Sequence, residues 1–232
     1  MRCAIYFVPP PGHPLSISAA AWLGRDVYSG AAVAAHAPGP TEAAHAALTA
    51  APRRYGFHAT IKAPFRLADG YDADLLGNRL GAFLAGTSPM SMELSIERLD
   101  AFYAFTPTRT IEPLLALAAR IVTEFDQFRA PLDDADLARR DVSRLSQEQL
   151  AHLTAWGYPY VLEQFQVHMT LTGPVEAGQR PQVEEALAAH FGTRPHPVDI
   201  SQLVVAVEPS DGAPFVVHSV HPFAVANTRP RA

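Results

Sequence analysis

The fold is decided by Tyr55-Gly-Phe-His-Ala-Thr-Ile-Lys-Ala-Pro64 and by its counterpart Phe165-Gln-Val-His-Met-Thr-Leu-Thr-Gly-Pro174. In both stretches an aromatic residue stands three positions before a histidine, a threonine two positions after it and a proline six positions after it. The two histidines, His58 and His168, are separated by close to half of the 232-residue chain. An internal repeat of this length predicts two similar lobes that face each other.

Strand periodicity sorts each stretch into an apolar and a polar face, because successive side chains of a strand point to opposite sides. The apolar faces are Phe57, Ala59, Ile61, Ala63 and Phe65 in the first stretch, and Val167, Met169 and Leu171 in the second. The polar faces are His58, Thr60 and Lys62, and His168, Thr170 and Thr172. This pattern predicts antiparallel strands that bury one face and present the other to a cleft. Two buried core histidines are disfavoured, because Lys62 and Thr172 would share that core.

A third His-x-Thr pattern, His152-Leu-Thr154, lies in a helical stretch that begins at Ser146. It lacks the aromatic residue and the proline, and residues two apart do not share a helix face. We therefore expect it to be a coincidence.

Composition limits the class of protein. Hydrophobic residues make up 48% of the chain, the net charge is −5 and there is one cysteine, Cys3. These values predict a globular cytoplasmic protein with a sizeable core, and they exclude a disulfide framework or a cysteine-rich zinc site. No apolar run is long enough for a membrane helix. An acidic chain without a basic stripe argues against long nucleic acid as a partner. A monomer is favoured.

Local patterns predict an α+β fold with antiparallel sheets and one bilobal unit spanning 1–232. The first lobe is expected over 1–105 and the second over 106–232, with a helical insertion at 126–160. Strands are predicted at 3–8, 55–65, 92–99, 101–105, 160–172, 200–207 and 215–220. Helices are predicted at 16–29, 41–49, 72–84, 111–128, 133–140, 146–157 and 181–191, with Ser16 or Ser18 capping the first and a Ser146–Gln149 capping box opening the sixth. Helices are expected on the outer face of each sheet.

Two imidazoles facing one cleft suit proton transfer in phosphoryl chemistry, since histidine titrates near neutrality. Thr60, Thr170, Lys62 and Arg54 are candidate phosphate ligands, and Tyr6 and Tyr160 are candidate cleft residues. Arg53 and Arg66 also flank the first motif. The insertion, with Arg129, Arg139, Arg140 and Tyr158, is expected to form either a wall or lid over the cleft or a surface hairpin. No metal or other cofactor is expected, because two histidines are an incomplete ligand set. The sequence contains no Gly-x-Ser-x-Gly elbow for a serine nucleophile.

The paired motifs resemble the two-histidine phosphoesterase superfamily. The segments 54–65, 128–131, 138–140, 156–161 and 168–173 resemble its branch associated with phosphonate metabolism. The resemblance implies a bilobal fold with a V-shaped cleft and metal-free hydrolysis of a cyclic phosphodiester. For this branch it suggests a phosphorylated sugar, 5-phosphoribosyl 1,2-cyclic phosphate, as the substrate.

The expected function is therefore a cyclic phosphodiesterase, a phosphoric diester hydrolase. One histidine would activate water and the other would protonate the departing sugar oxygen, and the sequence leaves open which is which. One alternative is an RNA or nucleoside 2′,3′-cyclic phosphodiesterase. A second is a non-catalytic protein that binds a phosphate ligand.

Overall fold

A computed structural model describes residues 1–35, 38–138 and 142–224. These residues form one antiparallel sheet of eight strands in the order β6-β3-β4-β5-β2-β1-β7-β8. The strands are β1 (Arg2–Phe7), β2 (Ala59–Phe65), β3 (Met90–Leu99), β4 (Phe102–Pro107), β5 (Met169–Thr170), β6 (His196–Ile200), β7 (Gln202–Glu208) and β8 (Val216–Pro222). The predicted α+β class with antiparallel strands is confirmed.

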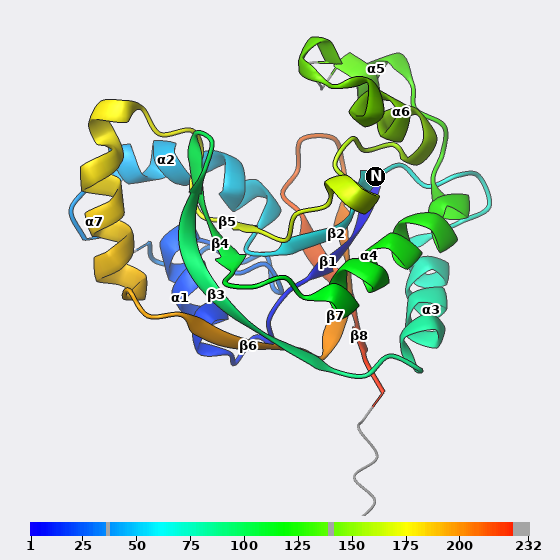
Figure 1. The fold of residues 1–232 in the computed structure, drawn as a ribbon, viewed down its shortest axis with the longest axis horizontal. Coiled ribbons are helices and arrows are strands. Elements are labelled where there is room, and N and C mark those ends of the chain that lie inside the picture. Colours follow the sequence, from blue (N-terminus) through cyan, green and yellow to red (C-terminus); the bar gives the residue numbers. More distant parts are fainter. Residues whose placement is uncertain (36–37, 139–141, 225–232) are drawn as a thin grey trace, which may run out of the picture.

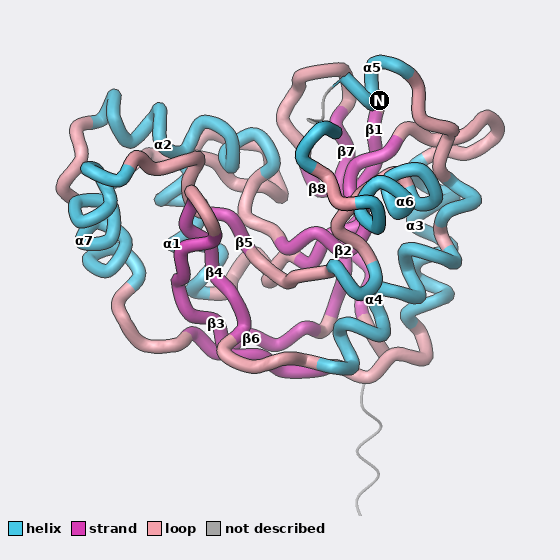
Figure 2. Tube along the Cα trace, turned by 45° about the horizontal axis from the view of Figure 1, so that its top comes forward, coloured by secondary structure: helices cyan, strands magenta, loops and turns pink. Residues whose placement is uncertain are grey.

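The helices are α1 (Pro14–Leu23), α2 (Glu42–Tyr55), α3 (Ala73–Leu84), α4 (Glu112–Glu124), α5 (Asp134–Ala138), α6 (Gln147–Trp156) and α7 (Arg180–Phe191). Figure 1 shows α1, α2 and α7 grouped at one side of the curled sheet and α3 and α4 at the other. The same two groups remain separate in the tilted view of Figure 2. None of the helices within the described ranges has the length and apolar character needed to cross a bilayer.

The sheet order mixes the two halves of the sequence. β3 and β4 lie beside β5 and β6, whereas β7 and β8 lie beside β1 and β2. The predicted boundary near residue 105 therefore does not coincide with a boundary between the flanks of the sheet. A pseudo-symmetric duplication stays a prediction.

Both faces of β1 are buried. Cys3, Ile5 and Phe7 lie in the main core, and Ala4 and Tyr6 lie in a second, smaller core with Phe215 and Val204 on the opposite face. Alternation along this strand therefore places Tyr6 on the face that carries the first histidine motif.

Helix α2 extends six residues beyond its predicted end at Thr49, to Tyr55, and contains Pro52. A proline has no backbone N–H, so the carbonyl four residues earlier loses its helical partner. That carbonyl, Leu48 O, instead accepts a hydrogen bond from Gly173 N at 2.7 Å. The proline thus ties α2 to the end of the second motif, and β2 begins at Ala59 rather than at Tyr55.

The strand predicted over 160–172 forms only at β5, Met169–Thr170. Beyond β5, Trp22 Nε1 donates to the backbone oxygen of Leu171 at 2.9 Å, and the side-chain oxygen Thr172 Oγ1 accepts a hydrogen bond from Tyr103 N at 3.0 Å. The side chain of Thr172 is consequently buried and does not continue the polar face.

Helix starts were predicted with mixed success. The capping box of Ser146 and Gln149 is present and opens α6. Helix α1, in contrast, begins at Pro14 with His13 as its cap, two residues before the predicted Ser16. A proline in the first turn is pre-organised for this position, which explains the earlier start.

Candidate functional site

The two histidine motifs lie on neighbouring antiparallel strands. Ala59 of β2 pairs with Met169 of β5, and both side chains are buried in the main core. Continuing this register by one residue in each direction sets His58 opposite Thr170, and Thr60 opposite His168. Directly opposed side chains have Cβ atoms about 4.5–5.5 Å apart. The structure therefore brings the four predicted motif residues together on one face of the sheet.

Both histidine rings are held in the same way. His58 Nδ1 lies 2.9 Å from Gly56 O, and His168 Nδ1 lies 2.9 Å from Gln166 O. Since a carbonyl oxygen only accepts, each ring donates from Nδ1 and its Nε2 carries the lone pair in the neutral form. His58 Nε2 lies 3.2 Å from Thr60 Oγ1. The backbone thus fixes the tautomer in which Nε2 is available as a proton acceptor.

Burial lowers the pKa of His58 to about 4. The hydrogen bond to Gly56 raises the pKa in part, and the electrostatic interaction with His168 lowers it further. An imidazole with this pKa is neutral at pH 7. His58 is therefore suited to accept a proton.

A cavity of about 840 Å³ opens beside His58 and Thr60. Tyr6, Ala63 and Pro64 also line it. Its remaining lining residues are Arg2, Arg54, Tyr55, Phe65, Arg66, Arg129, Ala130, Leu132, Asp136, Arg144, Leu145, Gly157, Tyr158, Pro159, Tyr160, Asp211 and Gly212. The predicted residues Tyr6, Arg54 and Tyr160 thus meet the first motif in one cavity. His168 and Thr170 are neighbours of that motif across the strand pair and are not among the lining residues described.

Three arginines, Arg2, Arg54 and Arg66, mark one end of this cavity, which we call the arginine end. Because Cys3 pairs with Phe65, Arg2 and Arg66 are neighbours across β1 and β2. Arg2 Nε donates to Glu208 Oε2 at 2.5 Å, and Arg54 Nη2 donates to Glu208 Oε1. Burial alone would raise the pKa of Glu208, but these two hydrogen bonds lower it. The buried carboxylate thereby holds two guanidinium groups at the cavity.

Lys62 does not lie where the sequence pattern placed it. Tyr6 pairs with Thr60, but the next pair is Ile5 with Lys62, so a β-bulge inserts one residue into β2. A bulge reverses the alternation of faces beyond it. Lys62 is therefore buried on the side of α4, where its Nζ donates to Val122 O at 3.0 Å and to Asp126 Oδ1 at 3.1 Å. The lining residues of the 840 Å³ cavity do not include it.

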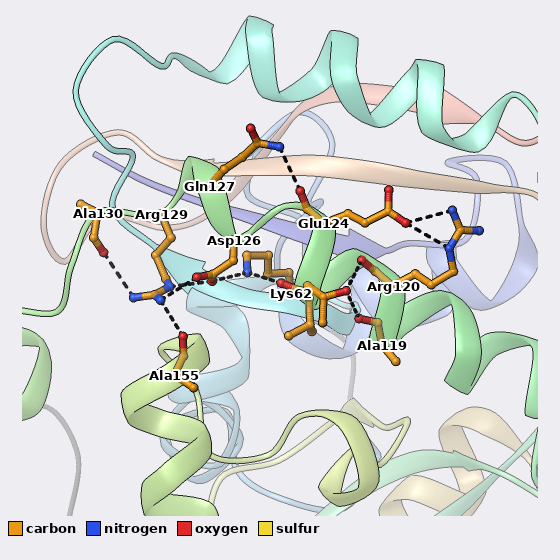
Figure 3. A network of polar contacts seen from close by, with 11 residues as sticks. Lys62, Ala119, Arg120, Glu124, Asp126, Gln127, Arg129, Ala130 and Ala155 are labelled. Carbon is orange, nitrogen blue, oxygen red and sulfur yellow. Dashed lines mark hydrogen bonds and ion pairs between the residues drawn. The ribbon is translucent and has the colours of Figure 1, made fainter.

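The helical insertion forms a wall of the cavity, to which it contributes Arg129, Tyr158 and Tyr160. Arg129 donates two hydrogen bonds of 2.8 Å to Asp126 and one of 3.0 Å to Ala155 O in α6. Figure 3 shows that these contacts continue to Lys62, so β2, α4 and α6 are joined by one polar network. Of the two predicted roles, the wall is the one the geometry supports. Arg139 and Arg140 lie outside the described residues.

Two other sequence candidates have structural roles. Arg53 donates to Leu23 O at 2.6 Å and to Thr49 Oγ1 at 2.8 Å, which joins α2 to α1. His152 lies in α6 and its Nε2 is 2.9 Å from Glu163 Oε1, as expected for a coincidental motif outside the cavity. Sequence reasoning missed Arg2 and Glu208, whose roles depend on a contact between distant strands.

Residues 60–216 match a family described as protein of unknown function (DUF1045). The chain belongs to this family. It is also similar to two curated proteins that are named ribose 1,5-bisphosphate phosphokinase PhnN. The one from Janthinobacterium sp. (strain Marseille) is 37% identical over 230 residues, which are 96% of this chain and 51% of that protein. The one from Laribacter hongkongensis (strain HLHK9) is 34% identical over 216 residues, 93% of this chain and 50% of that protein. The chain thus spans about half the length of these relatives.

These names contradict the cyclic phosphodiesterase expected from the sequence. A phosphokinase transfers a phosphoryl group to an acceptor, whereas a phosphoric diester hydrolase transfers it to water. The predicted hydrolase class is therefore wrong by this comparison. A phosphorylated sugar as the ligand agrees with the names of both relatives.

The described residues contain no group of three or more His, Cys, Asp or Glu side chains placed to hold a metal ion. Independence from a metal or another cofactor stays a prediction, as do the cytoplasmic location and the monomeric state.

Proposed function

We propose that this chain binds a doubly phosphorylated ribose in the cavity and supplies the sugar-phosphate site of a phosphoryl-transfer system. One observation carries the proposal: the His58–Thr60 pair and the arginine end line the same cavity. The relatives' name, ribose 1,5-bisphosphate phosphokinase PhnN, supports this ligand class and the expected connection with phosphonate metabolism.

The length and volume of the cavity suit a ribose that carries two phosphates. The distance between the two ends of the cavity can be estimated along β1, where Arg2 lies at the arginine end and Tyr6 lies opposite Thr60. These residues are four positions apart, which is about 13 Å at ~3.3 Å per residue. The Arg2 side chain reaches back over part of that distance. The cavity volume of about 840 Å³ is within the usual range of small-molecule sites, about 300–1,000 Å³. Between the two ends the floor includes the small side chains of Ala63 and Pro64, which leave room for a sugar ring.

The arginine end and the opposite end of the cavity, which carries His58 and Thr60, differ in their chemistry. Guanidinium groups bind phosphate oxygens through paired, charge-assisted hydrogen bonds. At the other end, where His58 and Thr60 lie, the neutral His58 imidazole accepts a proton from an oxygen of the bound sugar phosphate, and the Thr60 hydroxyl donates to a phosphoryl oxygen. The roles expected for His168 and Thr170, which lie across the strand pair from His58 and Thr60, stay predictions.

We place the site of the phosphoryl donor outside this chain, in the part of the relatives that it does not cover. The common phosphate-binding loop of kinases has the pattern Gly-x₄-Gly-Lys-Ser/Thr. The sequence does not contain it, and its single lysine is Lys62, which is buried and paired with Asp126.

Isothermal titration calorimetry with ribose 1,5-bisphosphate, ribose 5-phosphate, ribose and Mg–ATP tests the proposal. We expect the bisphosphate to bind most tightly, the monophosphate more weakly, and ribose and Mg–ATP not measurably. Arg54→Gln and Thr60→Val should each weaken bisphosphate binding about tenfold or more, in line with ~1.5–3 kcal/mol for a hydrogen bond to a charged group. Arg120→Gln, which removes an exposed arginine of α4, is the matched control. Tighter binding of Mg–ATP than of any sugar phosphate would overturn the proposal.

A further inference from the structure

Tyr6 occupies the floor of the cavity between its two ends. It lies on β1 opposite Thr60, and its ring packs on His58 with a centroid distance of 3.8 Å and an interplanar angle of 31°. The side chain is fully buried, and the ring of Phe215 lies on its other side at 6.0 Å.

The Tyr6 hydroxyl has no hydrogen-bond partner among the described residues, and the same is true of Arg54 Nε. Leaving a buried polar group unpaired costs about 1–3 kcal/mol. The other residues with an unpaired buried side-chain atom, which are His45, Thr106, His152, Arg180 and His196, do not line this cavity. Tyr6 and Arg54 both line this ligand-sized cavity and each has an unpaired donor, which indicates that a ligand supplies the missing partner.

The Tyr6 hydroxyl and Arg54 Nε are both suited to bind an anion. Burial raises the pKa of Tyr6 well above its ordinary value, so the hydroxyl keeps its proton and acts as a donor. Arg54 Nη2 already donates to Glu208, whereas Nε has no partner among the described residues. Arg2 adds a positive charge near the Tyr6 hydroxyl. A phosphate group has the charge and the number of acceptor atoms to satisfy these donors at once.

We propose that Tyr6 Oη and Arg54 Nε form a subsite for the second phosphate of the bound sugar, the one that does not face His58. This inference rests on the proposed function and extends it, because it makes Tyr6 the residue that distinguishes a bisphosphate from a monophosphate. The subsite spans the space between Tyr6 and the arginine end, where Glu208 fixes the guanidinium groups of Arg2 and Arg54.

The possible roles of the Tyr6 hydroxyl differ in the melting temperature and ligand binding that they predict for Tyr6→Phe. If the hydroxyl serves packing alone, removing it gains or loses little and leaves ligand binding unchanged. If a protein group pairs with it, Tyr6→Phe lowers the melting temperature. If the ligand pairs with it, Tyr6→Phe removes an unpaired buried group from the free protein, so the melting temperature stays equal or rises while binding weakens.

The test compares wild type with Tyr6→Phe and Arg54→Lys, and uses Tyr71→Phe as the matched control because Tyr71 is exposed and lies outside the cavity lining. Arg54→Lys keeps the positive charge and removes the Nε donor. Melting temperatures of the free proteins and dissociation constants for ribose 1,5-bisphosphate and ribose 5-phosphate are measured. We expect both cavity variants to reduce the wild-type preference for the bisphosphate about tenfold, the size of one hydrogen bond to a charged group. The control keeps the wild-type preference.

The outcomes separate the two proposals. A wild type that prefers the bisphosphate, with Tyr6→Phe unchanged in that preference, overturns the subsite alone. A lower melting temperature of free Tyr6→Phe also overturns it, because the hydroxyl then has a partner within the protein. A wild type that binds no sugar phosphate overturns the proposed function and the subsite with it.

Discussion

His58 combines a lowered pKa with a fixed tautomer, and this has a measurable consequence for stability. Its ordinary pKa is 6.5, and burial lowers the pKa to about 4 in the folded chain. Between pH 4 and pH 6.5, His58 binds a proton in the unfolded chain but not in the folded chain. The contribution of His58 to the free energy of unfolding is therefore present above pH 6.5 and is lost as the pH falls toward 4. We expect the ring signals of His58 in an NMR titration to change near pH 4. A midpoint near 6.5 would contradict the burial argument.

Gly157 ends α6 in the left-handed region, with φ of +75°, and a Cβ there would lie 2.8 Å from Arg129 Cδ. Gly192 has a similar φ of +80° and open space around it. Gly157→Ala therefore combines backbone strain with a steric clash, whereas Gly192→Ala carries backbone strain alone, which is the larger because its ψ is 179° rather than 3°. We expect Gly157→Ala to displace Arg129 and to weaken binding of ribose 1,5-bisphosphate at least several-fold, whereas Gly192→Ala changes only stability. Equal binding by the two variants would show that Arg129 does not shape the cavity.

At the scale of elements, the polar network around the Asp126 carboxylate joins β2, α4 and α6. Asp126 accepts hydrogen bonds from Lys62 and from Arg129. Removing one partner of a buried ion pair typically costs about 3–5 kcal/mol, because a charge is left unpaired. Lys62 is buried but the Asp126 carboxylate is partly exposed, so we expect Asp126→Asn to lower the free energy of unfolding in urea by about 2 kcal/mol, below that range. Lys62→Met should cost less, since Asp126 then keeps Arg129.

The control for this network is Glu124→Gln, which breaks the exposed pair between Arg120 and Glu124. Exposed pairs are worth less than about 1 kcal/mol. If Asp126→Asn cost no more than this control, the network would not be what holds the insertion to the sheet.

Elements with local signals could be predicted from the sequence. Helix α6 has its capping box, α3 has Asp72 as its N-cap, and β1 stops before three prolines. The limits of β5 could not be predicted, because 160–168 has the apolar and aromatic pattern of a strand. The regular pairing ends after Thr170, where Leu171 N and Thr172 N both donate to Tyr103 O. The bulge at Lys62 also leaves no local signal, so strict alternation assigned that side chain to the wrong face.

Within the site, the two histidines and their threonines were predicted together because the motif repeats. Their tautomers and the lowered pKa of His58 depend on backbone carbonyls and burial, which a sequence does not display. The pairing of Arg54 with Glu208 joins residues 154 positions apart in the chain. No spacing rule relates such positions. The activity was predicted wrongly because paired histidines are compatible with more than one kind of phosphoryl transfer.

At the scale of the whole molecule, the two flanks of the sheet meet at β5, which has two residues and a single paired position with β2, Ala59 with Met169. By comparison, β1 and β7 pair at five positions. Short pairings open more readily than long ones. We expect the amides of Met169 and Thr170 to exchange with deuterium faster than those of β1, and ribose 1,5-bisphosphate to slow this exchange. Ligand-independent exchange at β5 would place the bound sugar away from the strand pair.

The burial of Lys62 also provides a chemical reporter. It is the single lysine of the chain, and only 4% of its side chain is exposed. A reagent that acylates primary amines can reach it only when the contact among β2, α4 and α6 opens. The acylation rate at this position, followed by mass spectrometry of peptides, therefore measures how often the wall of the cavity separates from the sheet, without any introduced label.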